Sequence, residues 1–359
     1  MKIKDFCTFA PKSKIKAGQA IKDGQYMFFT SSKDENKRYI DYLYDGEAII
    51  MGTGGNATLH YYKGKYAVST DCVVLNPDER IRCKYLYYFF LANMAILEAG
   101  FKGAGLKHTN RKYIENIVVS KLPTFDEQDS VIKILDKISD IIRFRNLELK
   151  VFDNLIKARF VEMFGNPVSN PYGWKKVKLS ELGTLARGKS KHRPRNAPEL
   201  LGGPYPLIQT GDVAAAGLYI TECHNTYSEL GLRQSRMWKA GTLCITIAAN
   251  IAQTAIMTFD ACFPDSVVGF VPVTYIGAVY MHYWFSFFQK ILEEQAPQVA
   301  QKNINLQILS DLSVIVPPQE RISAFNDFVW QVNKSKVAIQ KSLDETQLLF
   351  DSLMQKYFK

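Results

Sequence analysis

The chain has 359 residues, of which 47% are hydrophobic, and a formal net charge of +10 from 45 lysines and arginines against 35 acids. This composition excludes a disordered chain, and the length allows two or three domains that each bury a core. The surplus of cations favours a polyanionic partner but does not by itself establish one.

Six cysteines are scattered without a C-x-x-C pair, so neither a zinc site nor a disulfide framework has its usual spacing. The N-terminal segment lacks the apolar core of a signal peptide. The longest apolar run, residues 85–97, is too short to span a bilayer. We therefore expect a cytoplasmic protein with reduced thiols and no membrane partner.

Residues 1–122 are predicted to form a first globular head. They are rich in β-branched and aromatic residues separated by glycine and proline turns, which is typical of short strands. Predicted strands and one predicted helix lie at 48–51, 65–68, 72–75 and 84–98. The mixture of strands and a helix favours an α/β or α+β head.

Residues 123–165 are predicted to form a long helix that begins after Pro123. Apolar residues step by four and three over many turns, and this 3.5-residue spacing makes a seam for another helix. The candidate pairing residues on this helix are Leu135, Ile138, Ile142, Leu149, Phe152 and Ile156.

Residues 166–316 are predicted to form a second head, and residues 317–359 a second long helix. Predicted strands and one helix in this head lie at 205–209, 243–247, 255–259, 267–271 and 277–294. The candidate pairing residues on the second helix are Val329, Val332, Ile339, Leu343, Phe350 and Leu353. Two helices with matching seams can pair antiparallel, whereas a single amphipathic helix would pack only on its own head.

The two halves repeat each other. TDCVV at 70–74 is echoed by PDSVV at 264–268, YLYYFF at 85–90 by YMHYWF at 280–285, and NIVV at 116–119 by DLSV at 311–314. Ordered matches at nearly one offset indicate a tandem duplication. The chain is therefore predicted to contain two copies of one unit, each a head followed by a helix.

This organisation resembles the specificity subunit of type I restriction-modification systems. The resemblance covers essentially the whole chain. The segments that carry it are EAIIMGTGGNATLHYYKGKYAVSTDCVVL (47–75), RFVEMFGNP (159–167), GWKKVKLSELGTLARGKS (173–190), and the KLP and VPPQERI entries to the two helices. It implies two tandem target recognition domains separated by two long helices that pair as an antiparallel coiled coil.

The resemblance also implies a function. Each head would read one half of a bipartite site on double-stranded DNA, while the helices would set the gap and dock two modification (methyltransferase) subunits. A restriction subunit would complete the complex. S-adenosylmethionine and ATP would act on those partners, and no cofactor is expected on this chain. The second head opens with a lead-in at Trp174 that has no evident counterpart in the first, which starts with MKIKDF, so the completeness of that N-terminus stays open.

Residues 186–195, ARGKSKHRPR, form a candidate phosphate-binding loop. Five cations in ten residues without an acid repel one another unless an anion neutralises them, and DNA phosphates do so. The candidates are Arg187, Lys189, Lys191, Arg193 and Arg195. A solvated loop made basic by drift is the alternative. The N-terminal lysines, from Lys2 to Lys22, form a more dispersed version.

Residues 51–60, MGTGGNATLH, do not match a nucleotide-binding G-x-G-x-x-G loop or a P-loop. Closely spaced glycines let a backbone approach a groove, which would expose Asn56, Thr58 and His60 as candidate base readers. An ordinary hairpin turn explains the same glycines.

Segments 101–112 and 295–307 occupy equivalent positions in the two copies and carry amides and bases. Amides and guanidiniums can bond bidentately to base edges. The candidates are Lys102, Lys107, His108, Asn110 and Arg111 in the first segment, and Gln298, Gln301 and Asn303 in the second. Divergence here is what reading two different half-sites requires, although ordinary surface divergence also produces it.

Catalytic residues are not predicted. The NP dipeptides are not followed by the residues of an adenine-methyltransferase loop, and Pro77-Asp78-Glu79 lacks the Glu-x-Lys of a nuclease. The five histidines have no metal-ligand spacing, so no metal site is expected. The sequence thus predicts a non-catalytic DNA-recognition subunit. The alternatives are a specificity subunit of another methylation or defence system and a coiled-coil scaffold that does not bind DNA.

Overall fold

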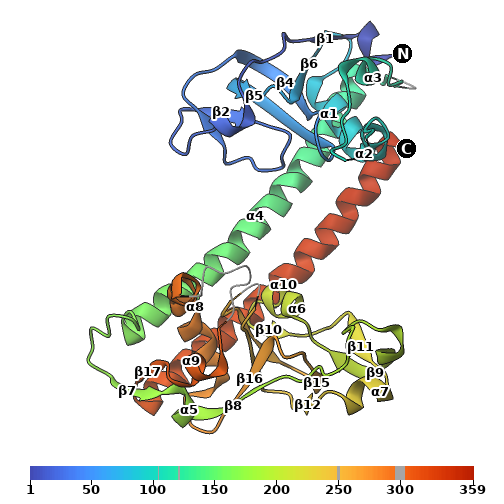
Figure 1. Ribbon diagram of the computed structural model, residues 1–359. Helices are drawn as coiled ribbons and strands as arrows, with labels where there is room; N and C mark the ends of the chain where they lie inside the picture. The colour runs from blue at the N-terminus through green and yellow to red at the C-terminus, as the bar shows by residue number, and fades with distance from the viewer. Residues whose placement is uncertain (104, 120–121, 249–250, 296–303) are drawn as a thin grey trace. The chain divides into compact units, whose positions relative to one another are not determined.

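The computed structural model describes residues 1–103, 105–119, 122–248, 251–295 and 304–359 (Figure 1). These divide into two compact units, residues 1–147 with 339–359, and residues 148–338. The two long helices, α4 (Phe125–Phe164) and α10 (Gln319–Phe358), therefore each give one half to each unit. None of the described helices is long and apolar enough to cross a membrane.

The first unit contains a six-stranded sheet with the order β1-β6-β4-β5-β2-β3, in which only β5 and β2 are parallel. Its elements ahead of α4 are η1 (Ile3–Asp5), β1 (Cys7–Phe9), η2 (Ala17–Gln19), β2 (Tyr26–Phe29), β3 (Arg38–Tyr39), β4 (Tyr44–Gly52), β5 (Thr58–Val68), β6 (Cys72–Pro77), α1 (Cys83–Ala92), α2 (Met94–Glu98) and α3 (Arg111–Glu115).

The central strands of this sheet are buried on both faces, which explains the continuous apolar run in β4. Ile49 and Met51 belong to the core that includes helix α1, whereas Ala48 and Ile50 belong to a smaller core on the opposite face. This alternation is the period of two that a strand imposes on its side chains. The predicted helix 84–98 is two helices, because the chain breaks at Asn93, whose side-chain amide donates to the carbonyl of Phe89 at 2.9 Å.

The second unit contains a five-stranded sheet, β10-β14-β13-β16-β8, a four-stranded sheet, β11-β9-β15-β12, and the pair β17-β7. Its elements ahead of α10 are β7 (Lys175–Lys178), α5 (Leu179–Leu182), β8 (Gly183–Arg187), η3 (Pro198–Leu200), β9 (Leu201–Leu207), α6 (Thr210–Ala215), β10 (Tyr219–Ile220), β11 (Asn225–Tyr227), α7 (Glu229–Arg233), β12 (Met237–Trp238), β13 (Leu243–Thr246), β14 (Thr254–Met257), β15 (Ala261–Cys262), β16 (Val267–Pro272), α8 (Gly277–Gln295), α9 (Leu306–Ser310) and β17 (Ser313–Val316).

The two units share one sheet topology. The order β1-β6-β4-β5-β2 in the first corresponds to β8-β16-β13-β14-β10 in the second, and in both the last pair is the only parallel one. The strands also begin to pair at equivalent places, since Gly52 at the end of β4 pairs with Cys72 and Thr246 at the end of β13 pairs with Val267, one residue beyond the match of Cys72 to Ser266 in the repeated motif. The predicted duplication is therefore present in the fold.

This topology also aligns the N-terminal segment of the first head with a part of the second head that follows Trp174. The backbone N–H of Lys2 donates to the Asp5 carboxylate at 2.8 Å, and that of Lys178 donates to the Glu181 carboxylate at 2.9 Å. A short helix and an edge strand follow in both places, η1 and β1 in one unit, α5 and β8 in the other. Because Lys2 corresponds to Lys178, the segment MKIKDF is equivalent to the part of the second head that starts at Val177.

Inside each unit the two long helices pack against each other in opposite directions. In the first unit the beginning of α4, with Leu135, shares a core with Met354 near the end of α10. In the second unit the end of α4, with Phe160, shares a core with Phe325 near the beginning of α10. Opposite halves thus meet in both units, as an antiparallel coiled coil requires.

Each of the predicted pairing residues is buried or half-buried. The buried ones are Leu135, Ile138, Ile156, Val329, Val332, Ile339 and Leu343, and the half-buried ones are Ile142, Leu149, Phe152, Phe350 and Leu353. The predicted seam omits Phe160, which is fully buried and contacts the rings of Phe164, Tyr280, Phe287 and Phe325. The predicted seam continued from Ile156 by a step of three, to Arg159. A step of four would have reached Phe160.

Candidate nucleic-acid interface

Two of the segments singled out in the first head lie side by side. Residues 53–57 form the hairpin loop between β4 and β5, and its Gly55 N–H donates to the carbonyl of Lys107 at 2.9 Å. The N–H of Thr109 donates to the carbonyl of Thr53 at 3.0 Å. The hairpin loop and the segment before α3 therefore form one surface.

The exposed side chains of this surface include Asn56, Lys102, Lys107 and His108. Lys102 and His108 are paired through two backbone hydrogen bonds of 2.9 and 3.0 Å. A Cβ atom at Gly54 would lie 3.3 Å from the His108 ring, so this glycine allows the two segments to approach. An amide, two ammonium groups and an imidazole are thereby presented together by backbone that is held in place.

Two predicted base readers of the hairpin are not exposed, and that expectation is wrong for them. Thr58 and His60 each have only 5% of their surface exposed. The His60 ring lies 3.3 Å from a Glu35 carboxylate oxygen and 3.1 Å from the carbonyl oxygen of Ser32, and it packs on Phe29. The physical reason is that β5 already begins at Thr58, so residues 58 and 60 point to the same inner face of the sheet.

Asn110 and Arg111 are exposed but occupied by intramolecular contacts. The Asn110 side-chain carbonyl accepts a hydrogen bond from the backbone N–H of Tyr113 at 3.0 Å and so caps helix α3. Arg111 pairs with Glu115 at 2.7 Å and lies over the ring of Phe9. Asn110 therefore has a structural role that its sequence position did not reveal.

In the second head, the predicted basic segment 186–195 consists of the last two residues of the edge strand β8 and the residues that follow it, and it is called the basic loop below. Arg187, Lys189, Lys191, Arg193 and Arg195 are all exposed. The loop backbone is anchored, because the Gln234 side-chain carbonyl accepts hydrogen bonds from the N–H of Lys191 at 2.6 Å and of His192 at 3.1 Å. Gly188 lies so close to the carbonyl oxygens of Phe263 and Pro264 that a Cβ atom would clash with both.

The arginines and lysines of the loop differ in their electrostatic surroundings. Arg195 forms an ion pair with Asp265 at 2.6 Å, Arg193 approaches the same carboxylate at 3.7 Å, and Arg187 donates to the backbone carbonyl of Asp265 at 2.9 Å. Within the described residues, no acidic side chain forms an ion pair with Lys189 or Lys191. The two lysines are therefore the cations most available to an external anion.

The first head has an equivalent loop that the sequence analysis did not align. After edge strand β1 comes Lys12-Ser13-Lys14, and after β8 comes Lys189-Ser190-Lys191. In both, the serine is 6% exposed and the flanking lysines are exposed. The match was missed because its offset is about 177, whereas the other repeats are about 195 apart. The tripeptide KSK, present in both halves, was the signal that could have revealed it.

The second head has an equivalent of the hairpin loop and the segment before α3, and the structure describes part of it. The N–H of Ile304 donates to the carbonyl of Ile247 at 3.0 Å, as Thr109 does to Thr53. Asn305 caps α9 as Asn110 caps α3. Gln298, Gln301 and Asn303 lie outside the described residues.

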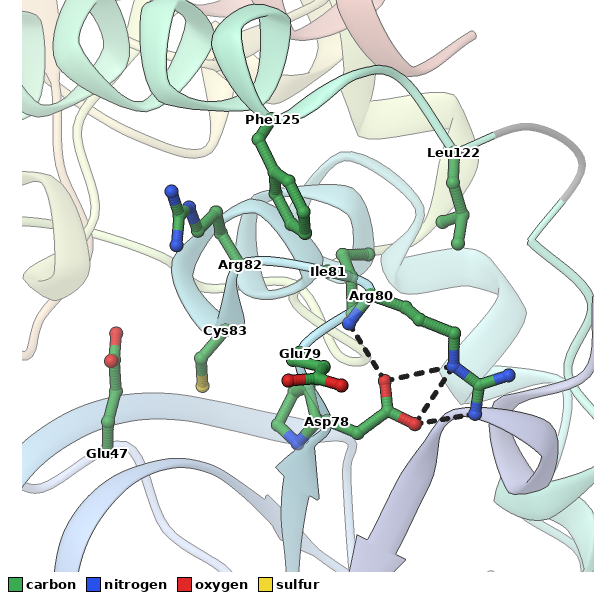
Figure 2. Close-up of a pocket in the computed structure, with 10 residues that line it drawn as sticks. Glu47, Asp78, Glu79, Arg80, Ile81, Arg82, Cys83, Leu122 and Phe125 are labelled. Atoms are coloured by element: carbon green, nitrogen blue, oxygen red, sulfur yellow. Dashed lines mark hydrogen bonds and ion pairs between the residues drawn. The ribbon is translucent and has the colours of Figure 1, made fainter.

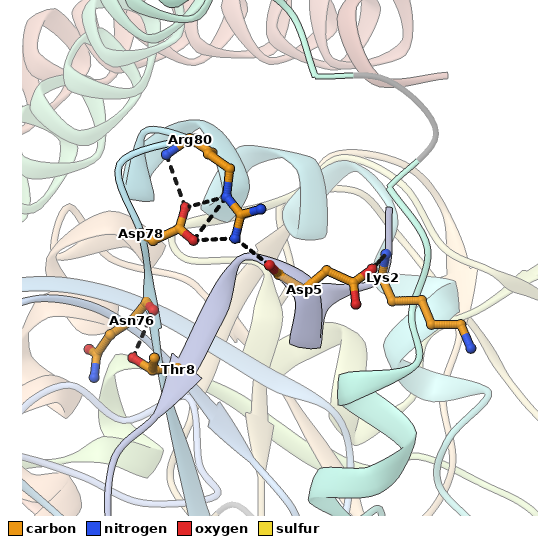
Figure 3. A network of polar contacts seen from close by, with 6 residues as sticks. All are labelled: Lys2, Asp5, Thr8, Asn76, Asp78 and Arg80. Atoms are coloured by element: carbon orange, nitrogen blue, oxygen red, sulfur yellow. Dashed lines mark hydrogen bonds and ion pairs between the residues drawn. The ribbon is translucent and has the colours of Figure 1, made fainter.

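A separate depression of about 980 Å³ in the first head has a different character (Figure 2). Its two arginines are paired within the unit, Arg80 with Asp78 and Arg82 with Asp129. The hydrogen bonds from Arg80 lower the pKa of the Asp78 carboxyl. Figure 3 shows that Arg80 also reaches the backbone carbonyl of Asp5. Asp78 therefore fixes the chain ahead of α1, which is a structural explanation for the Pro77-Asp78-Glu79 triplet.

Burial raises the pKa of the Cys83 thiol in the wall of this depression, which opposes formation of a thiolate. Among the described residues, no three histidine, cysteine or carboxylate side chains are grouped so that they could hold a metal ion.

The model of the type I restriction modification DNA specificity domain matches residues 1–151 and 171–351, one match for each head with most of its long helix. The chain belongs to this family. The resemblance drawn from the sequence is confirmed, and the loops described above are loops of two DNA specificity domains.

Two curated specificity subunits are similar to parts of the chain. The MjaVIII type I restriction enzyme specificity subunit of Methanocaldococcus jannaschii is 26% identical over 170 residues, which are 44% of this chain and 39% of that protein. The EcoDI specificity subunit of Escherichia coli is 24% identical over 144 residues, 40% of this chain and 32% of that protein. The alignments thus span well under half of each relative.

Solved structures share the fold of the whole chain. The crystal structure of a type I restriction-modification S subunit from M. genitalium covers 100% of this chain and 95% of its own, with a TM-score of 0.65 and 13% identity. A second structure, described as underlying complex assembly and conformational transition of the type I system, covers 100% and 97% with a TM-score of 0.53 and 15% identity. At these identities the likeness concerns the fold of the specificity domains.

Proposed function

We propose that this chain is the DNA sequence-recognition subunit of a type I restriction-modification complex, in which each head reads one half of a bipartite site. One observation carries the proposal most directly. The two heads share one sheet topology and one anchoring hydrogen bond, from Thr109 to Thr53 in the first and from Ile304 to Ile247 in the second, yet the equivalent segments 101–112 and 295–307 differ in sequence. A conserved frame with unlike reading surfaces fits the recognition of two unlike half-sites.

Phosphate contacts and base contacts are assigned to different loops in this proposal. The Lys-Ser-Lys loops bind the phosphates of the DNA backbone and supply affinity that does not depend on sequence. The lysines concerned are Lys12 and Lys14 in one head and Lys189 and Lys191 in the other. In the first head, Asn56 and His108 present hydrogen-bonding groups to base edges. Thr58 and His60 are not included among the proposed base readers, because their side chains are buried.

The long helices are proposed to set the distance between the half-sites. Forty helical residues extend about 60 Å, which corresponds to about 17 base pairs at 3.4 Å each and bounds the gap from above. Seven residues added to α4 and to the facing part of α10 preserve both seams and lengthen the pair by about 10 Å, or roughly three base pairs.

The outer faces of the helices fit partner subunits. Apolar side chains stay exposed along α4 at Ile134, Ile141, Phe144, Val151 and Leu155, and along α10 at Trp330, Val337 and Leu348. Exposed apolar patches of this kind mark interaction sites. We assign these faces to two modification subunits, which would bring the S-adenosylmethionine chemistry, with ATP-driven cleavage on a restriction subunit. The chain itself is proposed to be non-catalytic and to act in the cytoplasm, where the host DNA is.

Sequencing of methylated bases in the host, with and without this gene, tests the proposal. The expected result is a split methylated motif with a fixed gap that disappears when the gene is deleted. Loss of a continuous motif would point to another methylation system, and an unchanged methylome would reject the assignment. A filter-binding assay with mixed duplex DNA, with and without the modification subunit, separates a DNA reader from a scaffold.

A further inference from the structure

A cavity of about 270 Å³ lies beneath the basic loop of the second head. Its wall includes Ser190, Arg195 and Asn196 from that loop, and Gln209, Asn225 and Tyr227 from the adjoining four-stranded sheet region. The volume is several times the roughly 30 Å³ that one water occupies. It lies just below the range, from about 300 Å³, that accommodates drug-sized ligands. The cavity therefore suits one ring system.

The chemistry of the wall is neutral and rich in hydrogen-bonding groups. Side-chain amides come from Asn196, Gln209 and Asn225, and hydroxyls from Ser190 and Ser266. Arg195 brings the only charge of the described wall, and its guanidinium is already paired with Asp265. The described wall therefore has no unpaired cation to bind a phosphate, whereas it has hydrogen-bond donors and acceptors that fit the edge of a base.

The residues on either side of Ser190 have the opposite character. Lys189 and Lys191 flank Ser190 in the chain but do not line the cavity, and they are exposed and free of ion pairs among the described side chains. Cations in the loop next to an amide-lined interior match the two parts of a nucleotide, an anionic phosphate and an uncharged heterocyclic base.

Ser190 provides an independent sign that the cavity is built for a ligand. Its hydroxyl is buried, and no group in the described part of the chain forms a hydrogen bond with it. The equivalent hydroxyl of Ser13 in the first head accepts a hydrogen bond from the N–H of Ile15 at 3.1 Å. Buried polar groups without a partner are uncommon, because they cost the desolvation of the group.

We propose that this cavity binds a nucleotide unit, with the base inside and its phosphate on Lys189 and Lys191. The nucleotide can come from two sources, a free nucleotide or a residue of the bound strand that leaves the base stack. The strand source rests on the proposed function, since it requires bound DNA, and it is easiest for a base that is already unpaired.

The first arm of the test titrates the full chain with each of the four deoxynucleoside monophosphates, and separately with inorganic phosphate, by ligand-observed NMR. We expect at least one nucleotide to bind more tightly than phosphate. Ser190→Ala should weaken that binding roughly three- to tenfold, the value of one hydrogen bond, without lowering the denaturation midpoint. Ser13→Ala is the matched control and should leave nucleotide binding unchanged.

The second arm irradiates complexes of the full chain with random-sequence duplexes or single strands in which 5-iodouracil replaces thymine. Cross-links on peptides that contain Tyr227 or Asn225, lost in the rim-filling variant Asn196→Trp, identify the strand as the source. Asn196 is exposed, so this variant should fold. Nucleotide binding without such cross-links identifies a free nucleotide.

The proposal is overturned if no nucleotide binds and no cross-link reaches the cavity, or if Ser190→Ala and Asn196→Trp change neither readout. Failure of the proposed function looks different. In that case the unmodified chain, with its modification subunits, would not retain duplex DNA on a filter, while the nucleotide titration could still succeed.

Discussion

Asn110 and Asn305 each cap the N-terminus of a short helix at equivalent positions in the two heads. The side-chain carbonyl of Asn110 accepts a hydrogen bond from the Tyr113 N–H at 3.0 Å, and that of Asn305 accepts one from the Ile308 N–H at 2.8 Å. Each cap begins a short helix directly after the backbone hydrogen bond that ties the segment to the β4–β5 or β13–β14 hairpin. The caps therefore fix where each reading segment ends.

Replacement of either cap should destabilise its head. Asn110→Ala and Asn305→Ala each leave a helix N–H without its partner and should lower the free energy of unfolding by about 1 kcal/mol. Chemical denaturation measures this. Asn56→Ala, in the exposed hairpin loop, is the control and should change stability by less than about 0.5 kcal/mol. A change in sequence preference without a loss of stability in Asn110→Ala would instead make Asn110 a base reader.

Removal of the free lysines should weaken DNA binding for every sequence alike. Because each phosphate contact contributes about 0.9 to the slope of log affinity against log salt, Lys189→Ala with Lys191→Ala should reduce that slope by about two. Filter binding of mixed duplexes over a salt series gives the slope. The control removes the same charge from the exposed lysines Lys150 and Lys341 on the long helices. Equal slopes for the variant and the unmodified protein would refute the assignment of this loop.

The aromatic cluster at the end of α4 should dominate the stability of the second unit. Phe160 is fully buried and lies against the rings of Tyr280 and Phe325, so Phe160→Ala should cost about 3–5 kcal/mol. Phe144→Ala, on the exposed face of the same helix, should cost little and should instead weaken association with the modification subunits. Denaturation and co-purification of the two variants distinguish these effects, and equal losses of stability would contradict them.

Stability should fall with acid through His282. Burial lowers the pKa of this histidine to about 4, and the nearby Lys157 and Lys336 act in the same direction while Asp153 opposes them. The ordinary value is 6.5, so between pH 6.5 and about 4 the unfolded chain binds a proton that the folded chain does not. The stabilisation is complete above pH 6.5 and is lost as the pH falls.

The variant His282→Gln isolates this contribution. Glutamine can keep the hydrogen bond to Thr254, whose hydroxyl lies 3.0 Å from the histidine ring nitrogen. Denaturation midpoints of the two proteins should run parallel above pH 7 and converge or cross below pH 6, because only the unmodified chain loses the histidine contribution. Parallel curves down to pH 4 would show that His282 titrates alike in both states.

The long helices and the central parts of β4, β6, β13, β14 and β16 were predictable because their patterns are periodic and repeated. A 3.5-residue apolar repeat over forty residues indicates a helix that pairs with another helix. The helices α4 and α10 begin and end within two residues of the predicted ranges. The strands β11, β12 and β15 were not predicted, since two or three residues carry no detectable alternation. Their positions depend on pairing partners distant in the sequence.

The candidate site was only partly predictable. Loop exposure was inferred correctly for the five basic residues from Arg187 to Arg195, because a dense cation run cannot be buried. The predicted exposure of Thr58 and His60 was wrong. The residue at which β5 begins decides which side chains face inward, and a glycine-rich turn does not reveal that residue. The ion pair between Arg195 and Asp265 joins residues seventy positions apart, beyond the reach of any local pattern.

The division of the chain into units has a consequence for its synthesis. The first unit draws on residues 339–359, and Met354 is buried in the same core as Ile3 and Phe90. A ribosome delivers the chain from its N-terminus, so the first head keeps apolar surface uncovered until residues 339–359 have been translated. Removal of residues 339–359 would therefore damage the head formed by residues 1–122.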